Sequence, residues 1–267
     1  HFPLQIFAEP CSVAYKAHPD ILLDKVPDLV KILFKKLHNY ASVLKIELSK
    51  GKDFVMTDYN VFPDYKTRKE IINGLCGKYK FIKHCFAGKS VCGRGIDVLH
   101  IGNTKNRVLY CGGFHGSEYL TVLALLKFFE ECCQAMQNDN PVGEYKIGNF
   151  LSIRGLTIVP CVNPDGTEIA LHGSDAAFKY KPLVEKVCTD TYKWQANARG
   201  VDINHNFNAG WCRLKQLELK NNIKCPAPTR FGGNHPESEP ETKALTTLCR
   251  NIDFERAIAL HSQGREI

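Results

Sequence analysis

The stretch GGFHGSEYL, Gly112 to Leu120, contains His115 and Glu118, spaced three residues apart just after the apolar run RVLYC. Where a buried strand ends in a glycine turn, the next side chains emerge at the carboxyl edge of a sheet. An imidazole and a carboxylate placed there can converge on one cation. Catalytic zinc takes three protein ligands, commonly two histidines and a glutamate, and leaves a fourth position for water. Chance also places His-x-x-Glu pairs in plain turns, so the metal hypothesis needs a third ligand.

His261 meets that need, because the apolar segment AIALH ends on it. A large separation along the chain is typical of a site assembled between neighbouring strands. A second polar segment, ARGVDINHNFNAGW, interleaves asparagines with His205 directly after Asp202. Each amide needs several hydrogen-bond partners, so this density favours a polar pocket that binds a small ligand. A turn rich in asparagine is the alternative interpretation.

Apolar segments of strand length alternate with helical patterns along most of the chain. This alternation predicts an α/β fold, with a mixed, largely parallel central sheet and helices on both faces. The sequence NPDG, 163–166, suits a tight turn. Ser238 suits a helix N-cap, with Glu241 completing a capping box. The segments 172–194 and 211–237 are long for plain connections, which is typical of loops that line a ligand site. Strands are predicted at 81–88, 95–102, 107–113, 156–162 and 257–261, and helices at 65–79, 120–136 and 238–252.

The composition excludes several classes of protein. The chain has 267 residues, 44% of them hydrophobic, and no apolar run reaches the roughly 20 residues of a membrane span. Lys and Arg give a net charge of +7 but are scattered among acidic residues, so we expect neither nucleic acid nor a membrane as a partner. Twelve dispersed cysteines without a CxxC pair favour reduced thiols and a cytoplasmic protein over a secreted one. Residues 1–62 form an N-terminal extension of unknown role in this interpretation, and 63–267 form the domain that carries the candidate site.

The four motifs HGSE, NPDG, RGVDINHNFNAGW and ALHSQG follow one another in the order and approximate spacing of the zinc carboxypeptidase family. The chain resembles this family from about residue 64 to 267, and its nearest resemblance is to bacterial γ-D-glutamyl-diamino acid peptidases. The resemblance implies one Zn²⁺ per chain, held by His115, Glu118 and His261. It also implies that Asp202 fixes the ring of His115, and that Asn204 helps to hold the substrate.

Two positions depart from the family pattern. His205 stands where the family has an arginine that clamps the carboxylate of the substrate, and an imidazole lacks that fork. We therefore expect His205 to contact a peptide substrate whose end is altered and non-standard. Gln195 stands where the family has a basic residue that stabilises the oxyanion, and an amide supplies less charge there. Arg199, four residues further on, is the alternative source of that charge, or else an ordinary surface arginine.

The general base that the resemblance implies is a glutamate well downstream of His261, and Glu266 is too near His261 along the chain to fill that role. The general base is therefore not in this chain, and the catalytic domain is expected to be C-terminally incomplete, lacking a strand and a helix. Because related folds place that strand inside the sheet, its two neighbours should then expose unpaired backbone groups. The chain would need a missing C-terminal segment or a second fragment to fold.

Two functions follow from these expectations. The first is a zinc-dependent metallopeptidase of the metallocarboxypeptidase type that hydrolyses a peptide bond, including peptides derived from cell walls. The alternative is a catalytically degenerate zinc- or peptide-binding module that keeps the metal site without the general base. A zinc deacylase for small N-acyl amino acids shares the His-x-x-Glu…His scheme, but NPDG and INHNFNAG fit the peptidases better. In either leading case the expected partner is a peptide.

Overall fold

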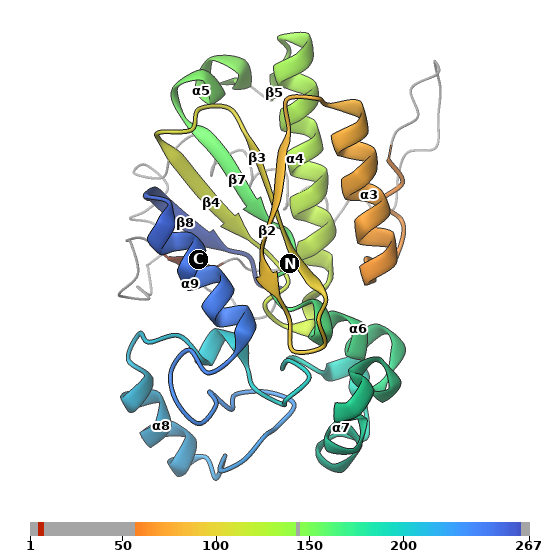
Figure 1. The fold of residues 1–267 in the computed structure, drawn as a ribbon, viewed down its shortest axis with the longest axis vertical. Helices are drawn as coiled ribbons and strands as arrows, with labels where there is room; N and C mark the ends of the chain where they lie inside the picture. The colour runs from red at the N-terminus through yellow and green to blue at the C-terminus, as the bar shows by residue number, and fades with distance from the viewer. Residues whose placement is uncertain (1–4, 8–56, 143–144, 263–267) are drawn as a thin grey trace.

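A six-stranded mixed sheet forms the centre of the protein in the computed structural model, which describes residues 5–7, 57–142 and 145–262. The strand order is β1-β8-β4-β7-β3-β2, and Figure 1 shows helices packed around this sheet. The predicted mixed α/β class is confirmed. The strands are β1 (Gln5–Phe7), β2 (Lys83–Lys89), β3 (Gly95–Ile101), β4 (Arg107–Cys111), β7 (Gly155–Val159) and β8 (Phe254–Ala259).

Parallel pairing is confined to the middle of the sheet, where β4 pairs with β7 on one side and with β8 on the other. The remaining pairs, β1 with β8, β2 with β3 and β3 with β7, are antiparallel. The sheet is therefore mixed as predicted, but antiparallel pairs outnumber parallel ones, so the prediction that it is largely parallel was wrong. β2 and β3 are joined by only the five residues 90–94, and so short a link can connect only antiparallel neighbours.

The outer edge of β8 has a partner in the structure. Residues 5–7 form β1, with Gln5 opposite Ala259 and Phe7 opposite Ala257. A segment of the assigned N-terminal extension thus supplies backbone partners along this edge of β8. Tyr59 also comes from that extension, and its hydroxyl donates to Glu130 Oε2 at 3.0 Å.

Side chains alternate between two apolar layers along the central strands, as the two-residue period of a strand requires. In β4, Val108 and Tyr110 face one layer, whereas Leu109 and Cys111 face the other. The first layer is covered by α3 (Tyr65–Lys78), α4 (Leu120–Asn138) and α5 (Ile147–Ile153), and the second by α9 (Pro240–Asn251). The sheet is thus covered on both faces, as predicted.

The two long segments expected as loops contain short helices. Figure 1 shows α6, α7 and α8 gathered near the ends of β4 and β7. Trp194 anchors α6 and α7, because it is fully buried in a third apolar cluster with Ile169 of α6 and Val184 of α7. A small hairpin lies between α4 and α5. These elements are β5 (Pro141–Val142), β6 (Tyr145–Lys146), α6 (Pro164–His172), η3 (Ser174–Tyr180), α7 (Lys181–Val187), η4 (Thr191–Lys193) and α8 (Trp211–Lys220).

The sequence NPDG begins α6 and is not the isolated turn that we predicted. Asn163 is the N-cap, and its side-chain oxygen accepts from the backbone N–H of Gly166 at 2.9 Å. Pro164 occupies the first turn of the helix, where its missing N–H costs nothing. The residues that make a good turn are also those that start a helix, so the local pattern alone did not separate the two.

The predicted capping box of α9 was also wrong. Glu239 is the N-cap residue of this helix and makes no side-chain cap bond, while the Ser238 hydroxyl donates to Glu239 Oε1 at 2.8 Å. Glu241 is fully buried and accepts from the backbone N–H of Val91 at 2.9 Å and from Asn197. Long-range contacts thus use the side chains that the local pattern assigned to capping.

Eleven of the cysteines lie in the described part of the chain, and all of them are free thiols. Burial raises the pKa of the Cys111 and Cys133 thiols, which keeps them in the unreactive protonated form. Among the described residues, no helix combines the length and the apolar character needed to span a bilayer.

A buried ion pair joins α6 to the segment between β2 and β3. Asp165 is fully buried and accepts from Arg94 Nη1 at 2.7 Å, from Ser90 Oγ at 2.8 Å and from the Cys92 backbone N–H at 2.7 Å. These contacts fix the start of α6, which lies directly against the turn carrying His115.

Removing this carboxylate should destabilise the fold strongly. We expect Asp165→Ala to lower the free energy of unfolding by about 3–5 kcal/mol, because it removes the closest carboxylate from the buried Arg94 and leaves only Glu168, at 3.9 Å, to balance its charge. Urea unfolding followed by circular dichroism measures the change. Asp253→Ala, at an exposed position after α9, is the control and should unfold like the unmodified protein. Equal stability of the two variants would contradict the structural role of Asp165.

Candidate metal centre

The turn that carries His115 and Glu118 begins where β4 ends and forms the short helix η2 (Gly116–Glu118). Two backbone bonds hold this turn against the segment after η4: Gly116 N–H donates to the Gln195 carbonyl at 3.2 Å, and Ser117 N–H to the Trp194 carbonyl at 2.8 Å. A Cβ on Gly116 would lie 2.1 Å from the Gly166 carbonyl oxygen. Only glycine therefore allows the turn to pack this closely.

His261 reaches the same place from β8. The backbone N–H of Leu260 donates to the Cys111 carbonyl at 2.8 Å, which extends the parallel pairing of β8 with β4 beyond the ladder itself. The following residue then projects beyond the carboxyl end of β4, toward η2. The sheet pairing thus brings together side chains 143 positions apart in the sequence.

The predicted cluster is formed around the Glu118 carboxylate. His115 Nδ1 lies 3.0 Å from Glu118 Oε1, and His261 Nδ1 lies 3.0 Å from Glu118 Oε2. The Ser262 backbone N–H also donates to Oε2, at 3.2 Å. Glu118 is only 1% exposed and His261 4%. Two imidazole nitrogens and one carboxylate therefore face one another in a nearly dry site.

This arrangement fits a zinc ion. One ligand atom from each of the three residues lies within 4.8 Å of the others. Zinc bonds of about 2.0–2.2 Å in tetrahedral geometry place ligand atoms roughly 3.3–3.5 Å apart, so the nitrogen–oxygen distances need to open only slightly. In the described part of the chain, this is the one group of three His, Cys, Asp or Glu side chains close enough to share a cation.

Asp202 lies behind His115, on the side of the ring away from Glu118. Its Oδ1 is 3.3 Å from His115 Nε2, and the carboxylate is held in turn by the backbone N–H groups of Arg230 at 2.8 Å and Asn204 at 3.1 Å. A carboxylate in this position directs Nδ1 of the imidazole toward the other ligands and makes the ring more basic.

Burial and charge act in opposite directions on these groups. Burial alone would lower the pKa of His115, but the hydrogen bonds and charges of Asp202 and Glu118 outweigh it and raise that pKa to about 10. Burial would raise the pKa of Glu118, yet the hydrogen bonds from His115 and His261 lower it to about 2. The pKa of Asp202 is lowered in the same way, chiefly by His115. The metal-free cluster therefore holds ionised carboxylates beside a protonated imidazole.

Gln195 lies beside the metal-binding turn. Its carbonyl accepts from Gly116, and its side-chain oxygen accepts a short hydrogen bond from the Thr229 hydroxyl. Thr229 Oγ1 is also 3.5 Å from Asp202 Oδ2. The Gln195 side chain is therefore linked to the carboxylate that orients His115.

Arg199 lies in different surroundings. Its guanidinium Nη1 is 3.5 Å from Glu239 Oε2, and its Nε–H donates to the Tyr180 hydroxyl at 3.4 Å. The described contacts of its guanidinium are thus with Glu239 and Tyr180, and with none of the three cluster side chains.

Asn204 and His205 belong to η5 (Ile203–His205), the single turn that follows Asp202. The Asp202 side chain accepts from the Asn204 backbone N–H and thereby caps this turn. His205 Nδ1 lies 2.9 Å from the Arg230 carbonyl, to which it donates. Both residues thus follow Asp202 closely in the chain, and both contact the segment around Asp202 and Arg230.

Asn163 is a structural residue of the site that sequence reasoning missed. It is fully buried, and its amide donates to the Phe114 carbonyl at 3.0 Å and to the Gln195 carbonyl at 3.1 Å. These bonds tie the residue before His115 to the segment after η4. The motif NPDG was the available signal, because an asparagine that caps a helix at a sheet edge is also positioned to hold the neighbouring loops.

Comparison with known proteins agrees with this geometry. Residues 69–267 match the zinc carboxypeptidase family. This range covers most of the chain and contains every site residue discussed above, so the protein belongs to the zinc carboxypeptidase family. The resemblance predicted from the four motifs is confirmed. The family uses Zn²⁺, which is the cofactor expected from the His–Glu–His group.

Among curated relatives, the γ-D-glutamyl-L-diamino acid endopeptidase 1 of Lysinibacillus sphaericus is 32% identical over 207 residues, which cover 76% of this chain and 51% of that protein. Rat carboxypeptidase B is 28% identical over 169 residues, 61% of this chain and 35% of that protein. The structure of thrombin-activatable fibrinolysis inhibitor is similar in fold, with a TM-score of 0.55 at 19% identity, over 85% of this chain and 51% of that one. The chain spans about half the length of the first two curated relatives it matches.

The contact between Asp202 and His115 should strengthen metal binding. We expect Asp202→Asn to weaken zinc affinity by about 10- to 100-fold, because the amide cannot hold the ring with a full negative charge. Competition with a chromophoric zinc chelator measures the affinity. Asp190→Asn, at the exposed N-cap position before η4, is the matched control. An unchanged affinity in Asp202→Asn would contradict the role of this contact.

Zinc binding should also release protons. Because the pKa of His115 is about 10 in the metal-free cluster, this imidazole is protonated at pH 7.5 and must lose its proton before a metal can bind. The apparent affinity should therefore rise about tenfold per pH unit as the pH increases toward 10. Glu118, with a pKa of about 2, releases none. Calorimetry in buffers of different ionisation enthalpy should detect about one proton released from His115 per zinc. Binding without proton release would contradict this protonation state.

Proposed function

We propose that this chain carries the metal-binding part of a zinc-dependent peptidase that hydrolyses a peptide bond. The observation that carries the proposal is the convergence of His115, Glu118 and His261 in a buried cluster at the carboxyl ends of β4 and β8. Membership of a family of zinc carboxypeptidases supports the same class of reaction. The proposed bond is of the γ-D-glutamyl-diamino acid kind, because the endopeptidase of L. sphaericus carries that substrate in its name.

The residues of this chain would bind the metal and keep it in one position. A zinc ion held there supplies a Lewis acid and lowers the pKa of its bound water toward neutrality. Asp202 keeps Nδ1 of His115 directed at the other ligands. We assign the Gln195 side chain, in the segment bonded to the same turn, as a hydrogen-bond donor to the substrate, and Asn204 and His205, which follow Asp202, as substrate contacts.

A second candidate function is a zinc- or peptide-binding module without catalysis. Three described contacts favour it. Gln195 brings no positive charge, and its oxygen is engaged by Thr229. His205 donates to the Arg230 carbonyl, and the Arg199 guanidinium is paired with Glu239. Of these three residues, Gln195 therefore carries no charge, and Arg199 is directed toward Glu239 and not toward the cluster.

Hydrolysis by the full-length protein separates the two functions. The substrate is a synthetic peptide with a γ-D-glutamyl bond to L-lysine, and a peptide with an α-L-glutamyl bond is the comparison. We expect zinc-dependent cleavage of the first peptide, lost on chelation and reduced at least about 100-fold in kcat/KM in His115→Ala, because one zinc ligand is then missing.

The control variant is His172→Ala, whose side chain is half-exposed and pairs with Asp64 outside the cluster. It should cleave like the unmodified protein. Cleavage that persists after complete removal of zinc would overturn the peptidase proposal. Stoichiometric zinc and peptide binding without turnover would support the binding module in its place.

A further inference from the structure

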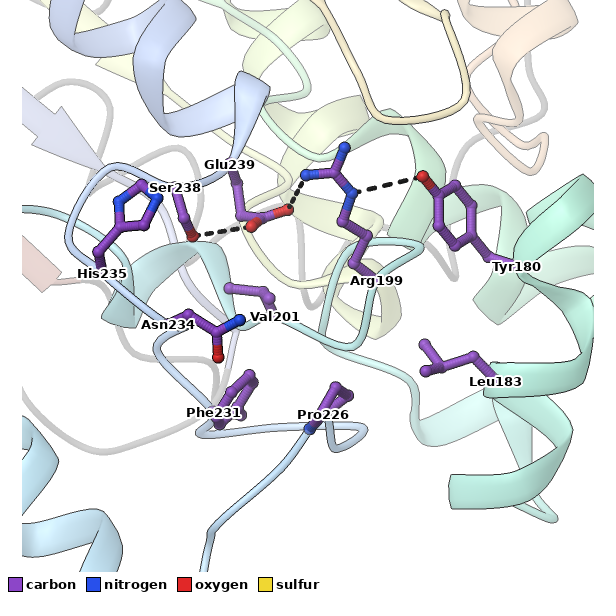
Figure 2. A pocket seen from close by; sticks show the side chains of 10 residues that line it. All are labelled: Tyr180, Leu183, Arg199, Val201, Pro226, Phe231, Asn234, His235, Ser238 and Glu239. Atoms are coloured by element: carbon purple, nitrogen blue, oxygen red, sulfur yellow. Dashed lines mark hydrogen bonds and ion pairs between the residues drawn. The ribbon is translucent and has the colours of Figure 1, made fainter.

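A cavity of about 370 Å³ lies beside α7, apart from the metal-binding cluster. Figure 2 shows Tyr180 and Leu183 on one side of it, Pro226 and Phe231 at its base, and the segment before α9 on the opposite side. None of His115, Glu118 and His261 lines it. The lining residues are Tyr180, Leu183, Arg199, Val201, Pro226, Phe231, Asn234, His235, Ser238 and Glu239.

The cavity borders the back of the segment that carries Asp202. Val201, in its wall, directly precedes Asp202, and the Asp202 backbone N–H donates to the carbonyl of Phe231 at 2.7 Å. The Asp202 carboxylate, by contrast, is directed toward His115. The cavity and the metal-binding cluster are therefore on opposite sides of one backbone segment.

Two opposite charges lie next to each other in the cavity. Arg199 Nη1 and Glu239 Oε2 are 3.5 Å apart, longer than the 2.7–2.9 Å typical of a close ionic hydrogen bond. The guanidinium has five N–H donors, and its described contacts with Glu239 and Tyr180 are both long. Since these two contacts use only some of its donors, the guanidinium can also donate to a carboxylate of a ligand.

Glu239 is held rigidly on the other side. Its side chain is 4% exposed; Oε1 accepts from the Ser238 hydroxyl and Oε2 from the Asn197 amide, both at 2.8 Å. A carboxylate offers about four lone-pair positions, so Glu239 can accept one further donor from a ligand. Figure 2 shows this carboxylate and the Arg199 guanidinium side by side at the cavity wall.

The rest of the lining is suited to an apolar group. Leu183, Val201, Pro226 and Phe231 line the wall and the base away from the charged pair. A cavity of this size lies at the lower end of the range, about 300–1,000 Å³, in which small-molecule sites fall. Glu239 would repel a ligand that is only an anion, and Arg199 would repel one that is only a cation. A ligand that carries both charges complements both residues.

We propose that this cavity binds a small zwitterion, an α-amino acid with an apolar side chain. Its carboxylate pairs with Arg199, its ammonium group donates to Glu239, and its side chain packs against Val201 and Phe231. This inference is independent of the proposed peptidase activity and of any bound metal.

L-Leucine is the probe, titrated by calorimetry into full-length protein. Isopentylamine, which keeps the charge and side chain but lacks the carboxylate, and 4-methylpentanoate, which lacks the ammonium group, are the matched comparison ligands. We expect leucine to bind and each comparison ligand to bind at least about tenfold more weakly, because each leaves one charged partner unsatisfied.

Variants test the position of the ligand. Arg199→Gln and Glu239→Gln should each weaken leucine binding at least about tenfold, because each removes one charged contact. Arg250→Gln, an exposed arginine of α9 paired with Glu237, is the matched control and should bind normally. Leu183→Trp, at a half-buried wall position, should abolish binding by filling the cavity while the thermal unfolding temperature stays unchanged.

Several results would overturn the inference. These are no binding of leucine up to its solubility limit, binding of 4-methylpentanoate or isopentylamine as tight as that of leucine, or normal binding in Leu183→Trp. The same measurement in His115→Ala separates this site from the metal centre. Binding there should persist, and its loss would place leucine at the metal-binding cluster instead.

Discussion

The burial of the Glu118 carboxylate is the constraint on which the arrangement of this domain depends. Glu118 is 1% exposed, and burying a carboxylate this far costs roughly several kcal/mol of folding free energy unless opposite charge surrounds it. His115 Nδ1 and His261 Nδ1 both lie 3.0 Å from this carboxylate, and a metal ion shared by the three side chains would supply positive charge at the same place. Each imidazole must come from the end of a different strand. The parallel pairing of β4 with β8, the tight glycine at position 116 and the capped start of α6 are the means by which the fold meets this requirement.

Asp202 is a second buried carboxylate that needs opposite charge or hydrogen-bond donors around it. Its negative charge is buried as well, and it is compensated by His115 and by the backbone N–H groups of Arg230 and Asn204. The segment that carries it is fixed from the other side by the backbone of Phe231. The segment that carries Asp202 thus has the His–Glu–His cluster on one side and the Arg199–Glu239 pair on the other.

The sequence allowed the main elements and the clustering of His115, Glu118 and His261 to be predicted, because strand ends and apolar periods follow from local chemistry. It did not predict features that depend on distant partners. Ser238 and Glu241 have the right spacing for a capping box, but buried contacts with Glu239 and Val91 use their side chains. Pairing of residues 5–7 with β8 has no local signal at all. The pairing of Arg199 with Glu239 likewise joins two segments forty positions apart in the sequence.

The large separation between the ligands also sets an order of events during synthesis. His261 follows Glu118 by 143 positions, and a ribosome that adds about 5–20 residues per second makes it roughly 7–30 seconds later. During that interval His115 and Glu118 can leave the ribosome, but His261, the third side chain of the cluster, has not yet been made. β8 is likewise not yet present beside β4. A metal ion met in that period finds only a two-residue site of low affinity. The complete centre can therefore form only after translation of β8, so loading with metal is a late event in the life of the chain.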